Sequence, residues 1–248
     1  MNDNRQKLLN IHINNLSMDE TVSAVFDIID RNCSGYVMPV NVDVMVKIDK
    51  DAELKEIADK ADIVLVDGQP LVWISKLRKA PVKAKVSGSD LVPRICSEAV
   101  ENGYKVFLFG GKEEVANNAK KNLERDYPGI HICGVYSPPF GFENDKDELE
   151  RIRKMIIDAS PNILVACLGC PKQEKWVYKY YNEFSSCVCI CAGATIDFLA
   201  GSVKRAPVWM SDHGLEWLYR FFKEPKRLFK RYFIDDVQII RLLFKYKK

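Results

Sequence analysis

The stretch between Ile163 and Trp209 places the tightest constraint on how this chain can fold. It contains two short apolar runs, ILVAC and CVCIC, each followed by a turn rich in small residues and then by a helical pattern. Short apolar runs that end at small residues are typical of strands buried on both faces of a sheet. The stretch therefore predicts two strands, each leading through a tight turn into a helix.

The polar residues of this stretch are concentrated at the two turns. If the two strands pair, both turns lie at one edge of the sheet. Ligands of open α/β sheets bind outside the carboxyl ends of the strands, where helix N-termini favour anions. We therefore expect an anionic small molecule to bind at this edge. The polar or turn-forming residues there include Gly169, Lys172, Gln173, Glu174, Asp197 and Arg205.

Strand and helix patterns alternate along the rest of the chain as well. A capping box at Ser17–Glu20 predicts one helix start, and Ser89 or Asp90 is expected to cap another helix. Repeated alternation is typical of a mostly parallel sheet with helices on both faces. The predicted fold class is α/β, with a Rossmann-like sheet. Beyond the two strands above, strands are expected over residues 8–13, 36–40, 63–66, 105–109 and 130–135.

The size and composition of the chain fit this fold. Its 248 residues, 47% of them hydrophobic, can bury one large core or two small lobes. No apolar window reaches the roughly 18 residues of a membrane span, and the N-terminus lacks the apolar segment of a secretory signal. We therefore expect a cytoplasmic protein.

The charge distribution sets the C-terminal region apart. Residues 214–248 hold ten Lys or Arg and four Asp or Glu, a formal charge of +6, so the remainder of a chain with net charge +3 carries −3. Apolar residues recur in this region at helical spacing. We therefore divide the chain into an α/β core, residues 1–213, and a basic helical appendage, residues 214–248. The appendage either docks on the core like an ordinary helix or binds an anionic membrane surface.

A carboxylate stands at the end of one predicted strand. Asp67 follows the apolar run 63–66 and precedes Gly68, a residue that lets backbone or ligand approach closely. This is a usual place for a catalytic group in an α/β protein. The alternative is that Asp67 caps the helix that follows.

Two other strand ends carry features that suit ligand binding. Gly110 and Gly111 stand between a strand and a helix, where they can cradle a phosphate, although the three spaced glycines of the dinucleotide motif are absent. Tyr136 begins the loop YSPPFGF, whose aromatic residues either stack on a base or sugar or cover the core.

The sequence gives little support to metal-dependent or nucleophilic chemistry. Cys167 and Cys170 have zinc-pair spacing, but Cys187, Cys189 and Cys191 alternate as on one face of a strand and offer no second pair. No Asp-x-Asp pair at a strand end suggests a Mg²⁺-bound diphosphate, and no Gly-x-Ser-x-Gly elbow is present. We expect no metal and no cofactor. Carboxylates, an amide and arginines remain, and such groups can activate a hydroxyl and hold a diphosphate leaving group.

Motifs spread over nearly the whole chain match one family. They are Asn41, Asp67-Gly68, Gly88-Ser89-Asp90-Leu91, Phe109-Gly110-Gly111, Gly169–Glu174 with Trp176, Gly193–Phe198 with Gly201, Arg205-Ala206-Pro207, Glu216–Arg220 with Glu224-Pro225, Arg227 and Arg231-Tyr232. In these motifs the chain resembles the WecG/TagA/CpsF glycosyltransferases. These bacterial enzymes add a sugar from a UDP-sugar to a lipid-diphosphate-linked acceptor in the synthesis of cell-surface polysaccharides.

The resemblance implies roles for individual residues. Asp67 matches the proposed general base of the family, Gln173 matches an active-site amide, and Asn41 belongs to the motif of the second strand. Arg220, Arg227 and Arg231 resemble C-terminal arginines that complete the site over the diphosphate. The chain departs from the family pattern at Pro39, where Thr is usual, and at Lys85, where Arg is usual. Candidate substrate-binding residues are Lys85, Gly88, Asp90, Gly110, Gly111, Tyr136, Gly169, Lys172, Glu174, Asp197 and Arg205.

The resemblance also implies the reaction and its partners. Family members are regarded as inverting and metal-independent, and N-acetylmannosamine is the donor sugar of the best-studied branch, with glucose and uronic acids elsewhere. The expected partners are a UDP-sugar, a polyprenyl-diphosphate-linked sugar and the inner surface of the cell membrane, with no nucleic acid. A homo-oligomer is compatible with these expectations.

Two other functional classes fit parts of the sequence. A non-catalytic module that binds membranes or nucleic acids suits the basic tail but leaves the polar strand ends unexplained. A nicotinamide-dependent dehydrogenase suits the α/β pattern alone. A preference for UDP over other nucleotides in thermal-shift measurements separates both from a UDP-sugar transferase.

Overall fold

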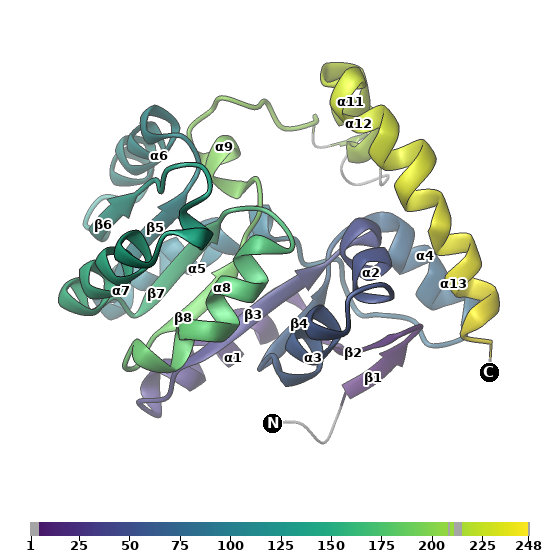
Figure 1. Ribbon diagram of the computed structural model, residues 1–248, viewed down its shortest axis with the longest axis horizontal. Coiled ribbons are helices and arrows are strands. Elements are labelled where there is room, and N and C mark those ends of the chain that lie inside the picture. The colour runs from purple at the N-terminus through teal and green to yellow at the C-terminus, as the bar shows by residue number, and fades with distance from the viewer. Residues whose placement is uncertain (1–4, 208, 211–214, 248) are drawn as a thin grey trace.

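A six-stranded parallel sheet organises the molecule (Figure 1). The computed structural model describes residues 5–207, 209–210 and 215–247. In that part of the chain the strand order is β4-β3-β8-β7-β5-β6, so the two strands of the 163–209 stretch pair, which is the condition for their turns to share one edge. The α/β fold class is confirmed. The strands are β3 (Gly35–Val40), β4 (Ile63–Val66), β5 (Lys105–Gly110), β6 (His131–Tyr136), β7 (Ile163–Cys167) and β8 (Val188–Cys191).

Helices cover both faces of the sheet. One face packs against α1 (Met18–Asp30), α5 (Gly88–Asn102), α6 (Glu113–Asp126) and α9 (Thr195–Leu199). The other face packs against α2 (Val42–Ile48), α3 (Ala52–Lys60), α4 (Gln69–Leu77), α7 (Lys146–Ala159) and α8 (Lys172–Tyr180). Successive residues of a strand point to opposite faces, which is why the apolar strands feed two separate cores.

The cysteines of β7 and β8 follow the same alternation. Cys187, Cys189 and Cys191 lie in the core of the second face, as predicted from their spacing, whereas Cys167 lies in the core of the first. Burial raises the pKa of the Cys167 thiol to about 12. Cys167 and the trio therefore pack on opposite sides of the sheet.

The single first strand expected over residues 8–13 is wrong. The chain instead forms an antiparallel hairpin of β1 (Arg5–Leu8) and β2 (Ile11–Asn14), which is separate from the main sheet. The turn at Leu9-Asn10 lacks the usual glycine: Leu9 has φ +54° and is buried. Packing of Leu9 and its neighbours against the core thus overrides the local turn preference. The side-chain oxygen of Asn14 accepts a hydrogen bond from the Val64 N–H at 2.9 Å and fixes the hairpin beside β4.

The helix caps differ from expectation at one helix and agree at another. The capping box at α1 is confirmed, with the Glu20 N–H donating to the Ser17 hydroxyl at 3.2 Å and the Ser17 N–H to Glu20 at 2.8 Å. At α5 the cap is Ser87, because its hydroxyl accepts from the Asp90 N–H at 3.2 Å, so the expected cap at Ser89 or Asp90 is wrong. This leaves the Asp90 carboxylate available to other partners.

The C-terminal helices lie along one edge of the molecule (Figure 1). They comprise α11 (Glu216–Lys223), α12 (Pro225–Lys230), a π-helical turn at Arg231–Asp235, a short turn at Asp236–Gln238 and α13 (Ile239–Lys245). Leu228 and Leu242 are buried, and Arg78, which follows α4, donates a hydrogen bond to the carbonyl oxygen of Leu243. None of the described helices is long and apolar enough to span a bilayer. The boundary expected at 213/214 falls outside the described residues.

Candidate active site

A cleft of about 650 Å³ opens at the carboxyl ends of β3, β4 and β8. This volume lies within the range of small-molecule binding sites. The core supplies one wall, and α11 and the segment from Arg231 to Ile240 supply the other. Residues far apart in the sequence therefore share one cavity. Of the predicted site residues, the lining includes Asn41, Asp67, Lys85, Gly88, Gly169, Gln173, Glu174, Arg220 and Arg231.

Asp67 is placed in the cleft by the end of β4. Its backbone N–H donates to the Val40 carbonyl at 2.8 Å, and Gly68, with φ +108°, then turns the chain into α4. The cap residue of α4 is Gly68 and makes no side-chain cap hydrogen bond, so the alternative that Asp67 caps this helix is wrong. Among the described residues, no hydrogen bond donor reaches the Asp67 carboxylate. The carboxylate is therefore open to a ligand.

Burial gives Asp67 the protonation behaviour of a general base. Desolvation raises the pKa of Asp67 to about 6; Lys85 and Arg220 lower it, and the carboxylates of Glu216 and Asp90 add to the rise. A carboxylate with a pKa near 6 is ionised at neutral pH and yet takes up a proton more readily than an ordinary aspartate.

A group of alternating charges surrounds Asp67. The ammonium group of Lys85 lies 3.4 Å from Asp90 and 3.5 Å from Glu216. Burial acts to lower the pKa of Lys85, but these carboxylates and Asp67 outweigh it and raise the pKa. Asp90 also pairs with Arg205 at 2.8 Å; burial acts to raise its pKa, but the Ser87 hydroxyl and these cations outweigh it and lower the pKa. Lys85 is thus held as a cation whose charge also acts on the Asp67 carboxylate.

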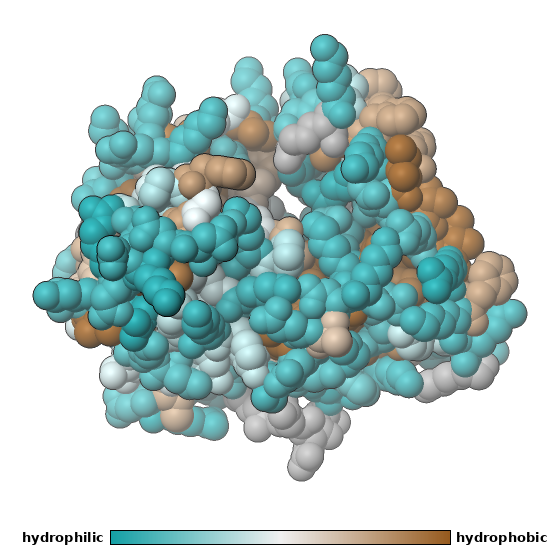
Figure 2. Space-filling model, in the orientation of Figure 1, coloured by the Kyte–Doolittle hydropathy of each residue, from teal (hydrophilic) through white to brown (hydrophobic). Residues whose placement is uncertain are grey.

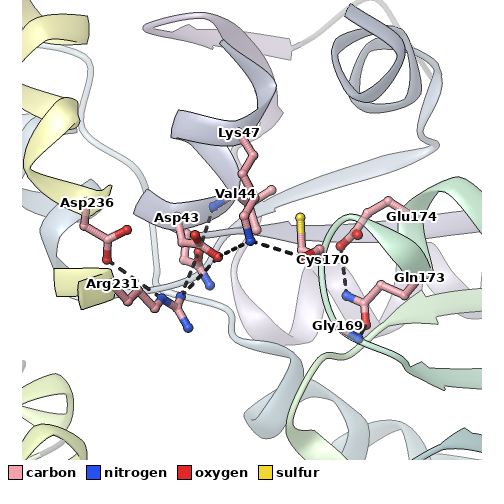
Figure 3. Close-up of polar contacts among 10 residues, drawn as sticks. Asp43, Val44, Lys47, Gly169, Cys170, Gln173, Glu174, Arg231 and Asp236 are labelled. Atoms are coloured by element: carbon pink, nitrogen blue, oxygen red, sulfur yellow. Dashed lines mark hydrogen bonds and ion pairs between the residues drawn. The ribbon is translucent and has the colours of Figure 1, made fainter. Parts of the chain in front are cut away.

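Gln173 joins the two turns that follow β7 and β8, and Figure 3 shows its contacts with Gly169 and Glu174. Its side-chain oxygen accepts hydrogen bonds from the N–H groups of Gly169 at 3.2 Å and Gly193 at 3.0 Å. Its amide nitrogen donates to Glu174 at 2.8 Å. The second carboxylate oxygen of Glu174 is buried without a partner among the described residues, and burial raises the pKa of Glu174. The hydrogen bonds of Gln173 therefore fix the shape of this wall of the cleft.

A chain of polar contacts links the C-terminal segment to the core (Figure 3). Arg231 donates to the Asn41 side-chain oxygen at 3.4 Å and lies 3.8 Å from Asp43. Lys47 pairs with Asp43 at 2.8 Å and donates to the Cys170 carbonyl at 3.1 Å. Arg231 is also 3.9 Å from Asp236, whose pKa burial raises to about 6. These contacts place the Arg231 guanidinium between the tail and the strand ends.

The C-terminal wall carries hydrogen-bond donors with no partner. The ring N–H of Trp217 and the Nε groups of Arg220 and Arg231 are buried, and no hydrogen bond to them is found in the described part of the chain. Buried donors are nearly always hydrogen-bonded, so these donors suit a ligand that offers acceptors; of the three, the Arg231 Nε also lies 3.9 Å from the Asp236 carboxylate. The guanidinium of Arg220 also lies over the Phe198 ring at 5.3 Å. Arg227 lies on α12, but its side chain is outside the described part.

Several predicted residues lie away from the cleft. Strand β7 separates β5 and β6 from β8 and β3, so the turns after β5 and β6 end elsewhere at the sheet edge. Gly111 and Lys172 line a second cavity of about 240 Å³ beside the loop that contains Phe140 and Phe142. In that loop Phe142 is buried and covers the core, whereas Phe140 is exposed. The predicted residues absent from the main cleft lining are Asp90, Gly110, Gly111, Tyr136, Lys172, Asp197 and Arg205.

The contacts of these residues explain their placement. Gly110 packs directly against the Cys167 backbone, where a Cβ atom would come within 2.4 Å of the carbonyl oxygen. The Tyr136 hydroxyl donates to Glu148 and accepts from Arg151. Arg205 and Asp90 pair at the rim, and Asp197 lies on α9, next to the cleft residue Phe198. No group of three or more His, Cys, Asp or Glu side chains within the described ranges is arranged to hold a metal ion.

The sequence interpretation missed part of the site. Asp43 and Lys47 lie on α2, a helix that was not predicted, although Asn41 caps it through a 3.1 Å bond from the Val44 N–H. Glu216 lies in a recognised motif, and Asp236 interrupts a basic segment. For both residues, the signal available in the sequence was an acidic residue within a predominantly basic region.

Comparisons with known proteins identify the family of the chain. The model of a family described as "Glycosyl transferase WecG/TagA/CpsF family" matches residues 6–248. The chain is 30% identical over 199 residues to the N-acetylglucosaminyldiphosphoundecaprenol N-acetyl-beta-D-mannosaminyltransferase of Bacillus spizizenii, covering 80% of this chain and 75% of that protein. A Bacillus subtilis protein of the same name matches equally, and one from Staphylococcus aureus is 31% identical over 173 residues, 70% of this chain and 66% of that protein.

Proposed function

This chain belongs to the WecG/TagA/CpsF glycosyl transferase family, and we propose that it transfers N-acetylmannosamine or a related hexose from a UDP-sugar to a polyprenyl-diphosphate-linked sugar. It is a glycosyltransferase of cell-surface polysaccharide synthesis. We propose that the polymer it helps to build is a teichoic acid, an exopolysaccharide or a capsule. Its relatives are named for N-acetylmannosaminyl transfer to N-acetylglucosaminyldiphosphoundecaprenol. The observation that supports the proposal most directly is the Asp67 carboxylate, with its pKa of about 6, in a cleft that also holds Lys85 and Arg220.

The proposed reaction is a single displacement with inversion. The acceptor hydroxyl attacks the anomeric carbon of the donor, and Asp67 takes up the hydroxyl proton as the new glycosidic bond forms. The bond between the anomeric carbon and the diphosphate oxygen breaks, and UDP leaves with the electron pair. Since one displacement occurs, the configuration at the anomeric carbon is inverted.

Cationic side chains stabilise the leaving group in this proposal. Arg220 and Arg231 each present a buried Nε–H that makes no hydrogen bond among the described residues, and Lys85 lines the same cleft as Asp67. Positive groups placed where charge develops lower the barrier without reorganising in the transition state. We propose that they and Arg227 act in place of a metal ion. Gln173 would then act by holding the turns at Gly169 and Gly193 around the sugar.

The exposed face of the C-terminal helices supports docking on the inner membrane surface. Large apolar side chains gather along this edge of the molecule (Figure 2). Phe222, Phe229 and Phe233 are more than half exposed, and Lys223, Lys226 and Lys230 alternate with them in sequence. Basic amphipathic helices of this kind bind anionic lipid surfaces. We propose that the tail brings the cleft to its lipid-linked acceptor at that surface.

A transfer assay with purified protein tests the proposal. Candidate UDP-sugars are offered together with an N-acetylglucosaminyl-diphosphate-lipid acceptor, with EDTA in excess, and both the product and its anomeric configuration are determined. We expect one UDP-sugar to be consumed with inversion. Hydrolysis or transfer that requires added Mg²⁺ or Mn²⁺ would contradict the metal-independent mechanism. Thermal stabilisation by NAD or polyanions but not by UDP would contradict the donor class.

A further inference from the structure

Part of the cleft lining is apolar, where Trp73 of α4 and the residues at the start of α13 border the cavity; we call this part the α4–α13 groove. On α4, Trp73 lines the cleft and is 48% exposed, and Leu77, one turn further, is 71% exposed. On the opposite side, Val237 and Ile240 line the cleft with exposures of 46% and 52%, and Phe244, one turn beyond Ile240, is 63% exposed. Large apolar side chains of both elements are thus left uncovered in the same part of the molecule.

Exposed apolar residues repeat along both helices. Residues four apart on a helix share a face, so Trp73 and Leu77 form one apolar row and Ile240 and Phe244 form the other. Arg78, which follows Leu77, donates a hydrogen bond to the carbonyl oxygen of Leu243, which precedes Phe244. This bond links the residue that follows α4 to α13, which lies along the same edge of the molecule as α4 in Figure 1. The end of α4 is therefore linked to α13 beyond the residues that line the cleft.

The groove is continuous with the polar centre of the cleft. A single cavity is lined by Asp67, Arg220 and Arg231 and also by Trp73, Val237 and Ile240. Its polar part holds N–H donors that make no hydrogen bond among the described residues and suit a diphosphate, and its apolar part lines the same cavity. A ligand that joins a diphosphate to an apolar chain matches this order of surfaces.

We propose that the α4–α13 groove binds the first isoprenoid units of the acceptor lipid, an inference that rests on the proposed function. The groove takes up the chain next to the diphosphate, while the exposed phenylalanines of α11 and α12 contact the membrane itself. Burial of the chain in the groove withdraws the acceptor head from the bilayer and presents its hydroxyl to Asp67. Chain recognition thereby contributes to acceptor affinity, since each buried methylene group stabilises the complex.

Binding of soluble prenyl diphosphates to the full-length protein tests the groove independently of transfer. Isopentenyl, geranyl and farnesyl diphosphate share the diphosphate and differ in chain length. Isothermal titration calorimetry without membranes or detergent should give a Kd that falls along this series, with farnesyl diphosphate binding ~10-fold or more tightly than isopentenyl diphosphate. Trp73→Ser and Ile240→Ser should each reduce this ratio severalfold, whereas Trp73→Phe should retain most of it. Thermal melts confirm that each variant is folded.

A matched control removes an exposed apolar side chain elsewhere. Ile157, on α7, is 44% exposed, and Ile157→Ser should leave the chain-length ratio unchanged. The proposal would be overturned if the wild type bound all three diphosphates with equal Kd. It would also be overturned if Trp73→Ser and Ile240→Ser both kept the wild-type ratio between the Kd values of isopentenyl and farnesyl diphosphate. A dimer that dissociates in Ile240→Ser without any chain-length dependence would overturn it too, because a second copy would then occupy the groove. If the protein transfers sugar but its Kd does not depend on chain length, the groove is refuted and the proposed function stands. If the Kd falls with chain length but no acceptor receives sugar, the proposed function is refuted and the groove stands.

Discussion

Replacing Asp67 with Asn should stabilise the protein at neutral pH while it abolishes most transfer. Burial raises the pKa of Asp67 from an ordinary value of 3.8 to about 6. The difference is about 2 pKa units, and each unit corresponds to ~1.4 kcal/mol, so ionisation of Asp67 costs the folded state up to about 3 kcal/mol. An isosteric amide carries no charge and avoids this cost. We expect a gain of ~1–3 kcal/mol in the free energy of unfolding, because solvent in the cleft moderates the desolvation.

The gain has a defined pH dependence. A group whose pKa is higher in the folded state than in the unfolded state adds stability below the unfolded value and loses it as pH rises through the folded value. For Asp67 that loss falls between pH 3.8 and about 6. The melting temperatures of wild type and Asp67→Asn should therefore be similar near pH 4 and separate until slightly above pH 6. In a chain of this size ~1 kcal/mol corresponds to roughly 2–4 °C.

Thermal melts from pH 4 to pH 8 and transfer assays on the same preparations provide the measurement. Turnover of the variant should fall ~10²-fold or more, because the amide cannot accept the acceptor proton. Wild-type kcat should itself decline as pH drops through about 6. Asp158→Asn, at an exposed position on α7, is the control and should change neither property. Near-normal turnover would remove Asp67 as the base, and a variant that melts lower at every pH would show that the carboxylate supports the fold.

Three further predictions concern the wall of the cleft, metal dependence and the tail. Gln173→Ala should lower transfer ~10-fold or more, because the turns at Gly169 and Gly193 lose their common hydrogen-bond partner. Cys170→Ala should leave transfer nearly unchanged. Steady-state kinetics of both variants measure this, and equal losses of activity would contradict it. Transfer should persist in excess EDTA, and a loss that Mn²⁺ restores would reveal a metal site. The double variant Phe222→Ser and Phe229→Ser should weaken salt-sensitive cosedimentation with anionic vesicles, and unchanged binding would place the membrane contact elsewhere.

The sequence predicted those elements whose pattern was set locally. Buried strands such as 63–66 and 163–167 are continuous apolar runs between turn residues, and their alternation with helices determines the fold class. Helix α2 was missed because Val42, Val44 and Val46 alternate with other residues as in a strand. The signal that distinguishes a helix there is the Asn41 cap, which the strand-like pattern concealed. The β1–β2 hairpin was missed because its turn depends on burial of Leu9.

The candidate site was predictable to the extent that it lies at strand ends. Asp67, Asn41 and Gln173 each follow a strand, and the parallel sheet brings all three to one edge. Strand order is a tertiary property, however, and it puts the Gly110-Gly111 turn on the far side of β7. The Lys47 contact with the Cys170 carbonyl spans 123 positions of the sequence. No local pattern encodes such a pairing, so these residues could be assigned only from the structure.

The C-terminal segment has two roles that deletion cannot separate. It supplies the unpaired donors of Trp217, Arg220 and Arg231 to the cleft, and its outer face exposes the phenylalanines proposed to meet the membrane. It also buries Leu228 and Leu242, so removing residues 214–248 would uncover apolar surface on the core. Loss of activity after truncation would therefore follow from a missing diphosphate site, a missing membrane contact or a damaged core alike. Point substitutions on the outer face leave the cleft donors and the core intact. Only such substitutions can therefore show whether transfer depends on docking at the membrane surface.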